Sequence, residues 1–190
     1  HNEYGVNVTF YVPTNGGKNN QSPWEEMIEK GHHVQSHTLS HPSSGNYDVM
    51  SEAAEWMDFY VSAKQINQML QIPSLTVAYS WGYNNEELSS KLFIGGRGVY
   101  GVSNGVKRTN YNSASSYSGF SSKSIAHITA THTEGGSNFG GWVSTHYHQI
   151  GETTVLESTL AHISAAQEAG ELWSAFFSDA SQYGQERDTA

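Results

Sequence analysis

Short runs of strand-forming residues alternate with helix-forming segments along this chain, and this alternation limits the fold more than any other feature. Residues 5–12 (GVNVTFYV) are rich in β-branched and aromatic side chains and end at a proline, as expected of a buried strand. Residues 22–30 then predict a short helix, with Ser22 as N-cap, Pro23 in the first turn and Gly31 after the end. Strands and helices that alternate in this way form parallel sheets through right-handed crossovers. The chain is therefore predicted to be an α/β protein.

The same alternation continues to the carboxyl end. Further strands are predicted over residues 33–38, 75–79, 93–102, 142–148 and 172–177. Further helices are predicted over residues 51–70, from Asn84 or Asn85 to Leu92, over residues 153–169, and from Ser178 towards Arg187. Residues 103–124 are rich in Ser, Asn, Gly and Tyr without a clear period, and are interpreted as a loop. A chain of 190 residues without an internal repeat predicts one domain spanning residues 1–190, as an open sheet or a closed barrel.

The composition excludes several classes of partner. A net charge of −9 with only 9 Lys and Arg residues argues against nucleic acid and against an anionic membrane surface. There is no apolar run long enough to cross a bilayer. Because the chain has no Cys and 10 His, any bound metal must be held by His and carboxylates. A surface rich in Asn, Ser, Thr and Gly suits neutral, hydroxyl-rich ligands.

The segment with the most specific chemistry is residues 31–43, which read GHHVQSHTLSHPS. His37 and His41 lie four residues apart directly after a predicted strand. In a helical turn, residues at this spacing share a face about 5 to 6 Å apart, so two imidazole nitrogens can reach one zinc ion. The alternative is that such a pair arises by chance in a chain with 10 His.

This segment resembles the second motif of the polysaccharide deacetylases, the NodB-like carbohydrate esterases, in which Gly-His is followed by His-Thr-Xaa-Xaa-His-Pro. By this resemblance, His37 and His41 are the two His ligands of a divalent metal, commonly zinc. Residues 8–12 resemble the strand before that motif, and residues 172–188 resemble the closing strand and helix of a bacterial branch of the family. The resemblance implies a distorted (β/α) barrel whose first strand is missing from the 190 residues, so that the domain is N-terminally incomplete.

Residues 78–83 (AYSWGY) resemble the third motif of the family, with two departures. The family has an Arg shortly before this motif, and a Pro where Ser80 stands. Trp81 takes the place of an aromatic residue whose backbone N–H helps to hold the oxyanion, which implies a catalytic role for Trp81. A tryptophan packed in the core is the alternative.

Residues 141–150 (GWVSTHYHQI) resemble the last motif, a strand that leads to a histidine acting as general acid. His148 fits that position best by resemblance. His146 lies two residues earlier on the same face of a strand and is the alternative, and either could be a structural histidine. Trp142 is a candidate for substrate binding by stacking on a sugar ring.

One family motif, Thr-Phe-Asp-Asp-Gly, does not occur in the 190 residues. One of its Asp residues is the catalytic base in the family and the other binds the metal. Asp48 and Asp58 lie in the wrong region to replace it, and Glu3 has no matching context. Either the start of the domain is absent from the sequence or the chain lacks the base and one ligand.

The resemblance implies an exported bacterial enzyme, secreted or at the cell surface, with a polysaccharide as partner and with room for flanking domains. Its reaction would be metal-dependent removal of acetyl groups from N-acetylglucosamine polymers such as chitin or peptidoglycan, or from acetylxylan. The alternative is a non-catalytic carbohydrate-binding or structural surface protein derived from this fold. A metal-storage module is disfavoured because the His residues cluster only at 32–41 and at 146–148.

Overall fold

In the computed structural model, described for residues 3–6, 8–15, 21–83, 85–107, 110–119, 123–148 and 153–190, strands and helices alternate as predicted. The strands are β1 (Thr9–Val12), β2 (His33–Ser36), β3 (Thr76–Ala78), β4 (Gly95–Arg97), β5 (Tyr117–Ser118) and β6 (Thr145–His146). The α-helices are α1 (Gln21–Glu29), α2 (Ser44–Tyr47), α3 (Glu52–Leu70), α4 (Glu86–Ser89), α5 (Ser124–His132), α6 (Thr153–Glu168) and α7 (Phe177–Thr189). Short 3-10 helices occur at Ser80–Gly82 (η2) and Tyr111–Ser113 (η3).

The strands run parallel and in chain order across the larger sheet. Within the described residues, β1, β2, β3 and β4 form one sheet in that order, and β5 pairs with β6 in a second, smaller sheet. A parallel bridge between Arg97 and Ala114 leads from the edge of the larger sheet towards β5. The predicted α/β class with parallel strands is confirmed.

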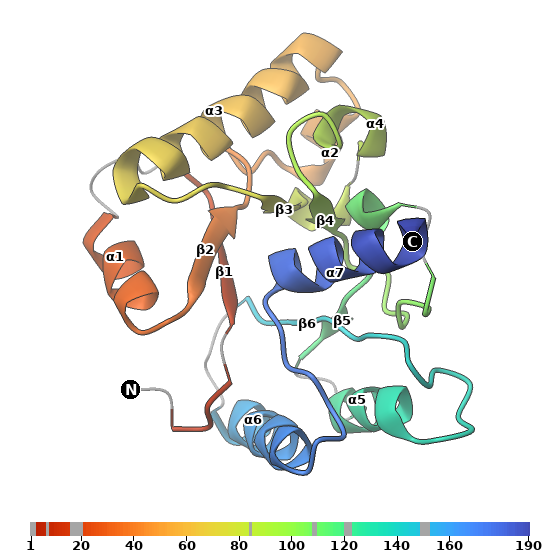
Figure 1. Cartoon of the computed structure of the whole chain (residues 1–190). Helices are drawn as coiled ribbons and strands as arrows, with labels where there is room; N and C mark the ends of the chain where they lie inside the picture. Colours follow the sequence, from red (N-terminus) through yellow and green to blue (C-terminus); the bar gives the residue numbers. More distant parts are fainter. Residues whose placement is uncertain are drawn as a thin grey trace.

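Two apolar clusters hold the larger sheet against its helices. The first joins β1 and β2 to α1 and α3 through buried side chains, namely Val12, Trp24, Val34, Ile66 and Leu70. The second lies between α3 and β3, with Phe59, Val77, Tyr79, Leu88 and Phe93. Both clusters include side chains from one stripe of α3. This helix therefore packs against the larger sheet, chiefly at β2 (Figure 1).

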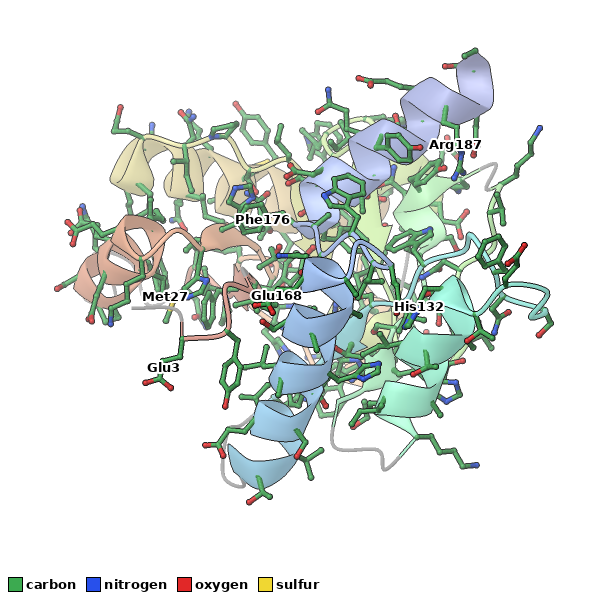
Figure 2. The ribbon with its side chains drawn as sticks, turned by 60° about the horizontal axis from the view of Figure 1, so that its bottom comes forward. Glu3, Met27, His132, Glu168, Phe176 and Arg187 are labelled. Atoms are coloured by element: carbon green, nitrogen blue, oxygen red, sulfur yellow. The ribbon has the colours of Figure 1, made fainter. Side chains whose placement is uncertain are left out.

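The second half of the chain surrounds the β5–β6 pair. Helices α5 and α6 pack against each other beside this pair, and α7 returns to contact β4 of the larger sheet (Figure 1). In a second view, His132 lies at the end of α5, near α6, and Phe176 lies where the chain enters α7 (Figure 2). The carboxyl-terminal helix thus connects the two halves of the fold.

Several sequence-based boundaries are wrong in instructive ways. Helix α1 begins at Gln21, so Ser22 lies inside the first turn rather than at the N-cap. Residues 172–177 form no strand, because Phe176 stacks flat on His33 with ring centroids 3.4 Å apart and the Phe177 N–H is donated to a side chain, Thr9 Oγ1, at 3.3 Å. Side-chain packing replaces backbone pairing in this segment.

Other boundaries differ in the same part of the chain. Helix α7 starts at Phe177, one residue before the predicted cap Ser178. The predicted loop at 103–124 contains η3 and β5, whose few residues are too short to give a periodic signal. Asn85 caps α4 by accepting from the Leu88 N–H at 3.1 Å, whereas Asn84 lies outside the described residues.

Within the described ranges, no helix combines the length and the apolar character that spanning a bilayer requires.

Candidate active site

Strained backbone marks the loops at the carboxyl ends of β2 and β3. Thr38, His41 and Trp81 have φ values of 65°, 47° and 59°, in the left-handed region that L-residues seldom adopt. Each such residue costs about 1 to 3 kcal/mol, and such costs persist mainly where geometry serves function. Ligands of parallel α/β folds also collect at this end of the strands. The loops after β2 and β3 are therefore the place where chemistry is expected.

His37 follows β2 directly and is held by the neighbouring strand. Its Nδ1 lies 2.8 Å from the carbonyl oxygen of Ala78. Because a carbonyl only accepts, Nδ1 must carry the proton, which leaves the Nε2 lone pair free for another partner. Burial lowers the pKa of His37, the hydrogen bond to Ala78 opposes this, and the charges of Arg97, His41 and His148 add to the lowering, so that the pKa is about 4. His37 is thus a neutral imidazole with one free lone pair at neutral pH.

His41 lies beside His37. The two ring centroids are 4.6 Å apart and the rings are nearly perpendicular, at 81°. The His41 N–H is donated to Thr38 Oγ1 at 3.1 Å, and that hydroxyl lies 3.3 Å from Ser80 Oγ. The sequence prediction that this pair converges is confirmed, although a loop with left-handed residues brings the rings together and a helical turn does not.

The donor set of this pair fits part of a metal site. A neutral imidazole with a hydrogen-bonded Nδ1 and a free Nε2 is the usual form of a histidine ligand, and His37 has that form. Among the described residues, no group of three or more His, Asp or Glu side chains is placed to hold an ion. The pair would supply two ligands to a bound metal, and the described residues do not add a third.

Trp81 lies beside His41 and is exposed to solvent. Its side chain is 64% exposed, its ring centroid lies 6.0 Å from that of His41, and its Nε1–H is donated to the Pro42 carbonyl at 3.1 Å. The alternative of a tryptophan packed in the core is therefore wrong. Gly82 follows with φ 78°. A Cβ at Gly82 would clash with Val99, so the turn after β3 lies close to the segment that follows β4.

The last-motif histidines lie on and just beyond β6. His146 is half-buried, and its Nδ1 lies 2.8 Å from Ser116 Oγ, whereas His148 is exposed, with its ring centroid 5.2 Å from that of His146. Burial, with the charges of Arg97 and His148, lowers the pKa of His146 to about 4. The charge of His148 contributes to the lowered pKa of both His37 and His146. Which of the two histidines is the acid stays a prediction.

Comparison with known proteins agrees with this geometry. Residues 2–92, which include the His37–His41 loop and Trp81, match the family model for polysaccharide deacetylase. The predicted likeness to polysaccharide deacetylases is confirmed. Among curated proteins, none matches the chain.

Several solved structures share this fold. Peptidoglycan deacetylase PdaC from Bacillus subtilis matches with a TM-score of 0.59 at 14% identity, over 99% of this chain and 82% of that one. A family 4 carbohydrate esterase from Streptomyces lividans, in complex with acetate, gives 0.59 at 15% identity, over 92% and 80% of the two chains. The Xyl-CE4 domain of a multidomain xylanase from the hindgut metagenome of Trinervitermes trinervoides gives 0.58 at 15% identity, over 95% and 78%. The NodB-like architecture expected from the sequence is therefore confirmed.

Trp142 packs against the carboxyl-terminal helix. It is half-buried, with its ring centroid 5.5 Å from that of Phe177 on α7, and its backbone pairs with Asn104. Packing against α7 accounts for this tryptophan, and contact with sugar stays a prediction.

Sequence reasoning missed two groups beside the candidate site. Arg97, at the end of β4 and directly opposite Ala78, is almost fully buried and lies over the Tyr11 ring, 5.5 Å from its centroid. Asp58 on α3 accepts a hydrogen bond from the loop that carries His41. A lone arginine between glycines in a strand-like run (IGGRGV) is the signal that could have revealed Arg97. For Asp58, the only sequence signal is an acidic residue at a position that the helical pattern of α3 places on its buried side.

Proposed function

We propose that this chain is a metal-dependent hydrolase that removes acetyl groups from a polysaccharide. The observation that carries the proposal is the convergence of His37 and His41 at the carboxyl end of β2, with the Nδ1 of His37 engaged by Ala78 and its Nε2 free. The same segment falls within the polysaccharide deacetylase match over residues 2–92.

A divalent metal, zinc by resemblance, would be held by His37 and His41 and would act as the Lewis acid that polarises the acetyl carbonyl and activates water. The backbone N–H of Trp81 is assigned to the oxyanion that develops on the carbonyl oxygen. Because Trp81 is fixed at φ 59° and its indole is tied to Pro42, this backbone N–H needs little reorganisation during the reaction.

His148 is assigned as the general acid that protonates the leaving amine or alcohol. It is exposed, so it can meet the sugar, and its ring centroid lies 5.2 Å from that of His146. His146 is held by Ser116 instead and stays the alternative acid. The proton of the attacking water is taken by an Asp in the family, within a motif that the 190 residues do not contain.

The substrate is proposed to be an N-acetylglucosamine polymer, such as chitin or peptidoglycan, or acetylxylan, met outside the cell or at its surface. An exposed indole beside the metal pair suits a flat sugar ring, and the net charge of −9 suits a neutral polymer better than an anionic one. Single-domain organisation over residues 1–190, with other domains able to flank it, remains part of the same proposal.

A second candidate function is carbohydrate binding without catalysis. It is favoured by one observation, that among the described residues no carboxylate joins His37 and His41 to complete a metal site. A protein of this kind would retain binding to acetylated polymer and release no acetate.

Zinc binding and acetate release test the two candidates together. Zinc per chain is measured by equilibrium dialysis, and acetate is measured with acetylated chito-oligosaccharide and with acetylxylan, each with and without a chelator. Both measurements are made on the 190 residues and on a version extended upstream to supply a Thr-Phe-Asp-Asp-Gly motif, since the 190 residues do not contain this motif. The deacetylase proposal expects one tightly bound zinc, and acetate release that the chelator abolishes, in the extended version. Zinc binding without acetate release, together with retained affinity for the polymer, would select the second candidate.

Histidine variants locate the metal. His37→Ala and His41→Ala are each expected to lose the zinc, because either change leaves a single imidazole. His127→Ala is the matched control, since His127 stacks on Tyr117 of β5 at 3.9 Å and takes no part in the pair. Retention of stoichiometric zinc by the double variant would overturn the metal assignment.

A further inference from the structure

The acidic side of α3 faces the loops of the site. Glu55 and Asp58 lie one turn apart on this helix, and each residue is only 5% exposed. Among the described residues, neither carboxylate forms an ion pair with Lys or Arg. Burying a carboxylate without a cation costs free energy, so two such groups on one helix call for a reason beyond stability.

Asp58 contacts the loop between the two metal-pair histidines. Its Oδ1 accepts from the Ser40 N–H at 2.9 Å, and its backbone carbonyl accepts from the Leu39 N–H at 3.2 Å. Hydrogen bonds from a backbone N–H to a carboxylate are stronger than those to a neutral oxygen. Two successive amides of the loop are thus held to one residue of a well-packed helix.

The hydrogen bond to Ser40 bears directly on His41. Ser40 precedes His41, whose φ of 47° is costly and requires the preceding peptide to be held in place. The Thr38 hydroxyl holds the amide of His41 from the other side, at 3.1 Å. The His41 ring can face His37 only while this part of the loop keeps its conformation.

We propose that Asp58 is a positioning residue, which holds the loop from Thr38 to His41 through the Ser40 amide and so sets His41 in place for metal binding. This inference rests on the proposed function, because it concerns the same metal pair. Asp58 does not touch the metal itself; it acts through the backbone. Partners that orient ligands in this way contribute about 10- to 100-fold to metal affinity.

Glu55 provides a matched control on the same helix. It has the same exposure as Asp58, and its Oε2 accepts from Asn85 Nδ2 at 3.0 Å. Asn85 caps α4, so Glu55 supports the loop after Trp81 and not the loop that carries His41. Replacing Glu55 therefore removes a buried carboxylate of α3 without removing a contact to the metal loop.

The test compares zinc affinity among the wild type, Asp58→Ala, Asp58→Asn and Glu55→Ala, with circular dichroism to confirm that each variant is folded. Asp58→Ala is expected to weaken zinc binding by about 10- to 100-fold. Asp58→Asn is expected to stay within about fivefold of the wild type, because its amide oxygen still accepts from Ser40. Glu55→Ala is expected to bind zinc like the wild type.

A second measurement does not depend on metal. Amide hydrogen exchange of Ser40 in the zinc-free protein should be faster in Asp58→Ala by about 10-fold or more, and unchanged in Glu55→Ala. If the wild type binds no zinc through His37 and His41, the proposed metal site fails, while Ser40 exchange still decides whether Asp58 positions the loop. Wild-type Ser40 protection in Asp58→Ala would overturn the inference. So would equal losses of zinc affinity in Asp58→Ala and Glu55→Ala, or in Asp58→Ala and Asp58→Asn.

Discussion

The indole Nε1–H of Trp81 is donated to the carbonyl oxygen of Pro42 at 3.1 Å, which joins the loop after β3 to the loop after β2. This contact matters because the two loops carry different parts of the proposed chemistry. The loop after β2 presents the metal pair, and the loop after β3 presents the backbone N–H assigned to the oxyanion. Their relative position therefore depends in part on a side chain that is otherwise exposed.

Trp81→Phe keeps an aromatic ring beside His41 and removes the indole N–H that makes this hydrogen bond, together with part of the aromatic surface. We expect acetate release, measured as kcat/KM, to fall by about fivefold, corresponding to about 1 kcal/mol for one hydrogen bond. Trp173→Phe is the matched control, because Trp173 is exposed and packs edge-on against Tyr183 of α7. If Trp81→Phe is as active as the control, the hydrogen bond to Pro42 is not needed to hold the two loops in their relative position.

Arg97→Met tests the buried guanidinium next to the site. Among the described residues the Nε of Arg97 has no hydrogen-bond partner, and the best contact of its NH1 is Ser116 Oγ at 3.4 Å. Replacing such a cation with an apolar side chain of similar length is expected to leave stability unchanged or raise it by about 1 to 4 kcal/mol. Urea unfolding measures this, and a clear loss of stability would show that the contacts of the buried Arg97, with the Tyr11 ring among them, outweigh the cost of burying its charge.

The same variant should change a neighbouring histidine. Because the positive charge of Arg97 contributes to the lowered pKa of His146, its removal should raise that pKa. The pKa is measured from the His146 ring protons by NMR in zinc-free protein. An unchanged pKa would mean that the charge of Arg97 does not contribute to it.

Sequence reasoning predicted that His37 and His41 lie together after a strand, because their spacing and the strand signal occur in one short segment. His37 and His41 follow a run with a clear strand signal, so their place at the carboxyl end of β2 could be predicted. Helix α3 was also predictable, since its Ser51 N-cap and its apolar spacing agree. Local sequence patterns predict the structure correctly where tertiary contacts favour the same conformation, as they do in these two segments.

The rest of the site depends on contacts between segments far apart in the chain. Ser116 lies in a stretch without any period, yet it meets His146 thirty residues later. Phe176 ends a strand-like run but packs on His33, which no local pattern reveals. Pairings of this kind are set by the tertiary structure, so the strand predicted at 172–177 was wrong and the partners of His146 and Arg97 were missed.

Gly96→Ala tests how closely β4 approaches the core. A Cβ at Gly96 would clash with the ring and hydroxyl of Tyr79. Tyr79 is only 1% exposed, and its hydroxyl oxygen lies 2.7 Å from Ser89 Oγ and 2.7 Å from the Asn112 carbonyl oxygen. Because Tyr79 is anchored, it cannot move aside, and we expect a loss of about 1 to 3 kcal/mol in unfolding free energy. Gly105→Ala is the control, since its Cβ would meet nothing nearer than the Lys107 carbonyl at 3.6 Å, and a loss below about 0.5 kcal/mol is expected there. Equal losses in both variants would contradict the packing argument.

The lowered pKa of His146 predicts a pH dependence of stability. Burial, followed by the charges of Arg97 and His148, lowers this pKa from 6.5 to about 4 in the folded protein. As pH falls below the unfolded value, the unfolded chain takes up the proton first. The stabilisation is therefore complete above about pH 6.5 and is lost as pH falls towards about 4. Because His146 is only half-buried, solvent screening reduces its contribution to roughly 1 to 2 kcal/mol.

Urea unfolding of zinc-free protein from about pH 7.5 to about pH 4.5 measures this loss. His146→Gln should show a shallower decline than the wild type, because its side chain does not titrate. The remaining decline would come from other groups, His37 among them, whose pKa is lowered mainly by burial. Arg97→Met should also flatten the wild-type curve, since it raises the folded pKa of His146 towards the unfolded value. Curves for His146→Gln and the wild type that run parallel would show that His146 keeps an ordinary pKa in the folded chain.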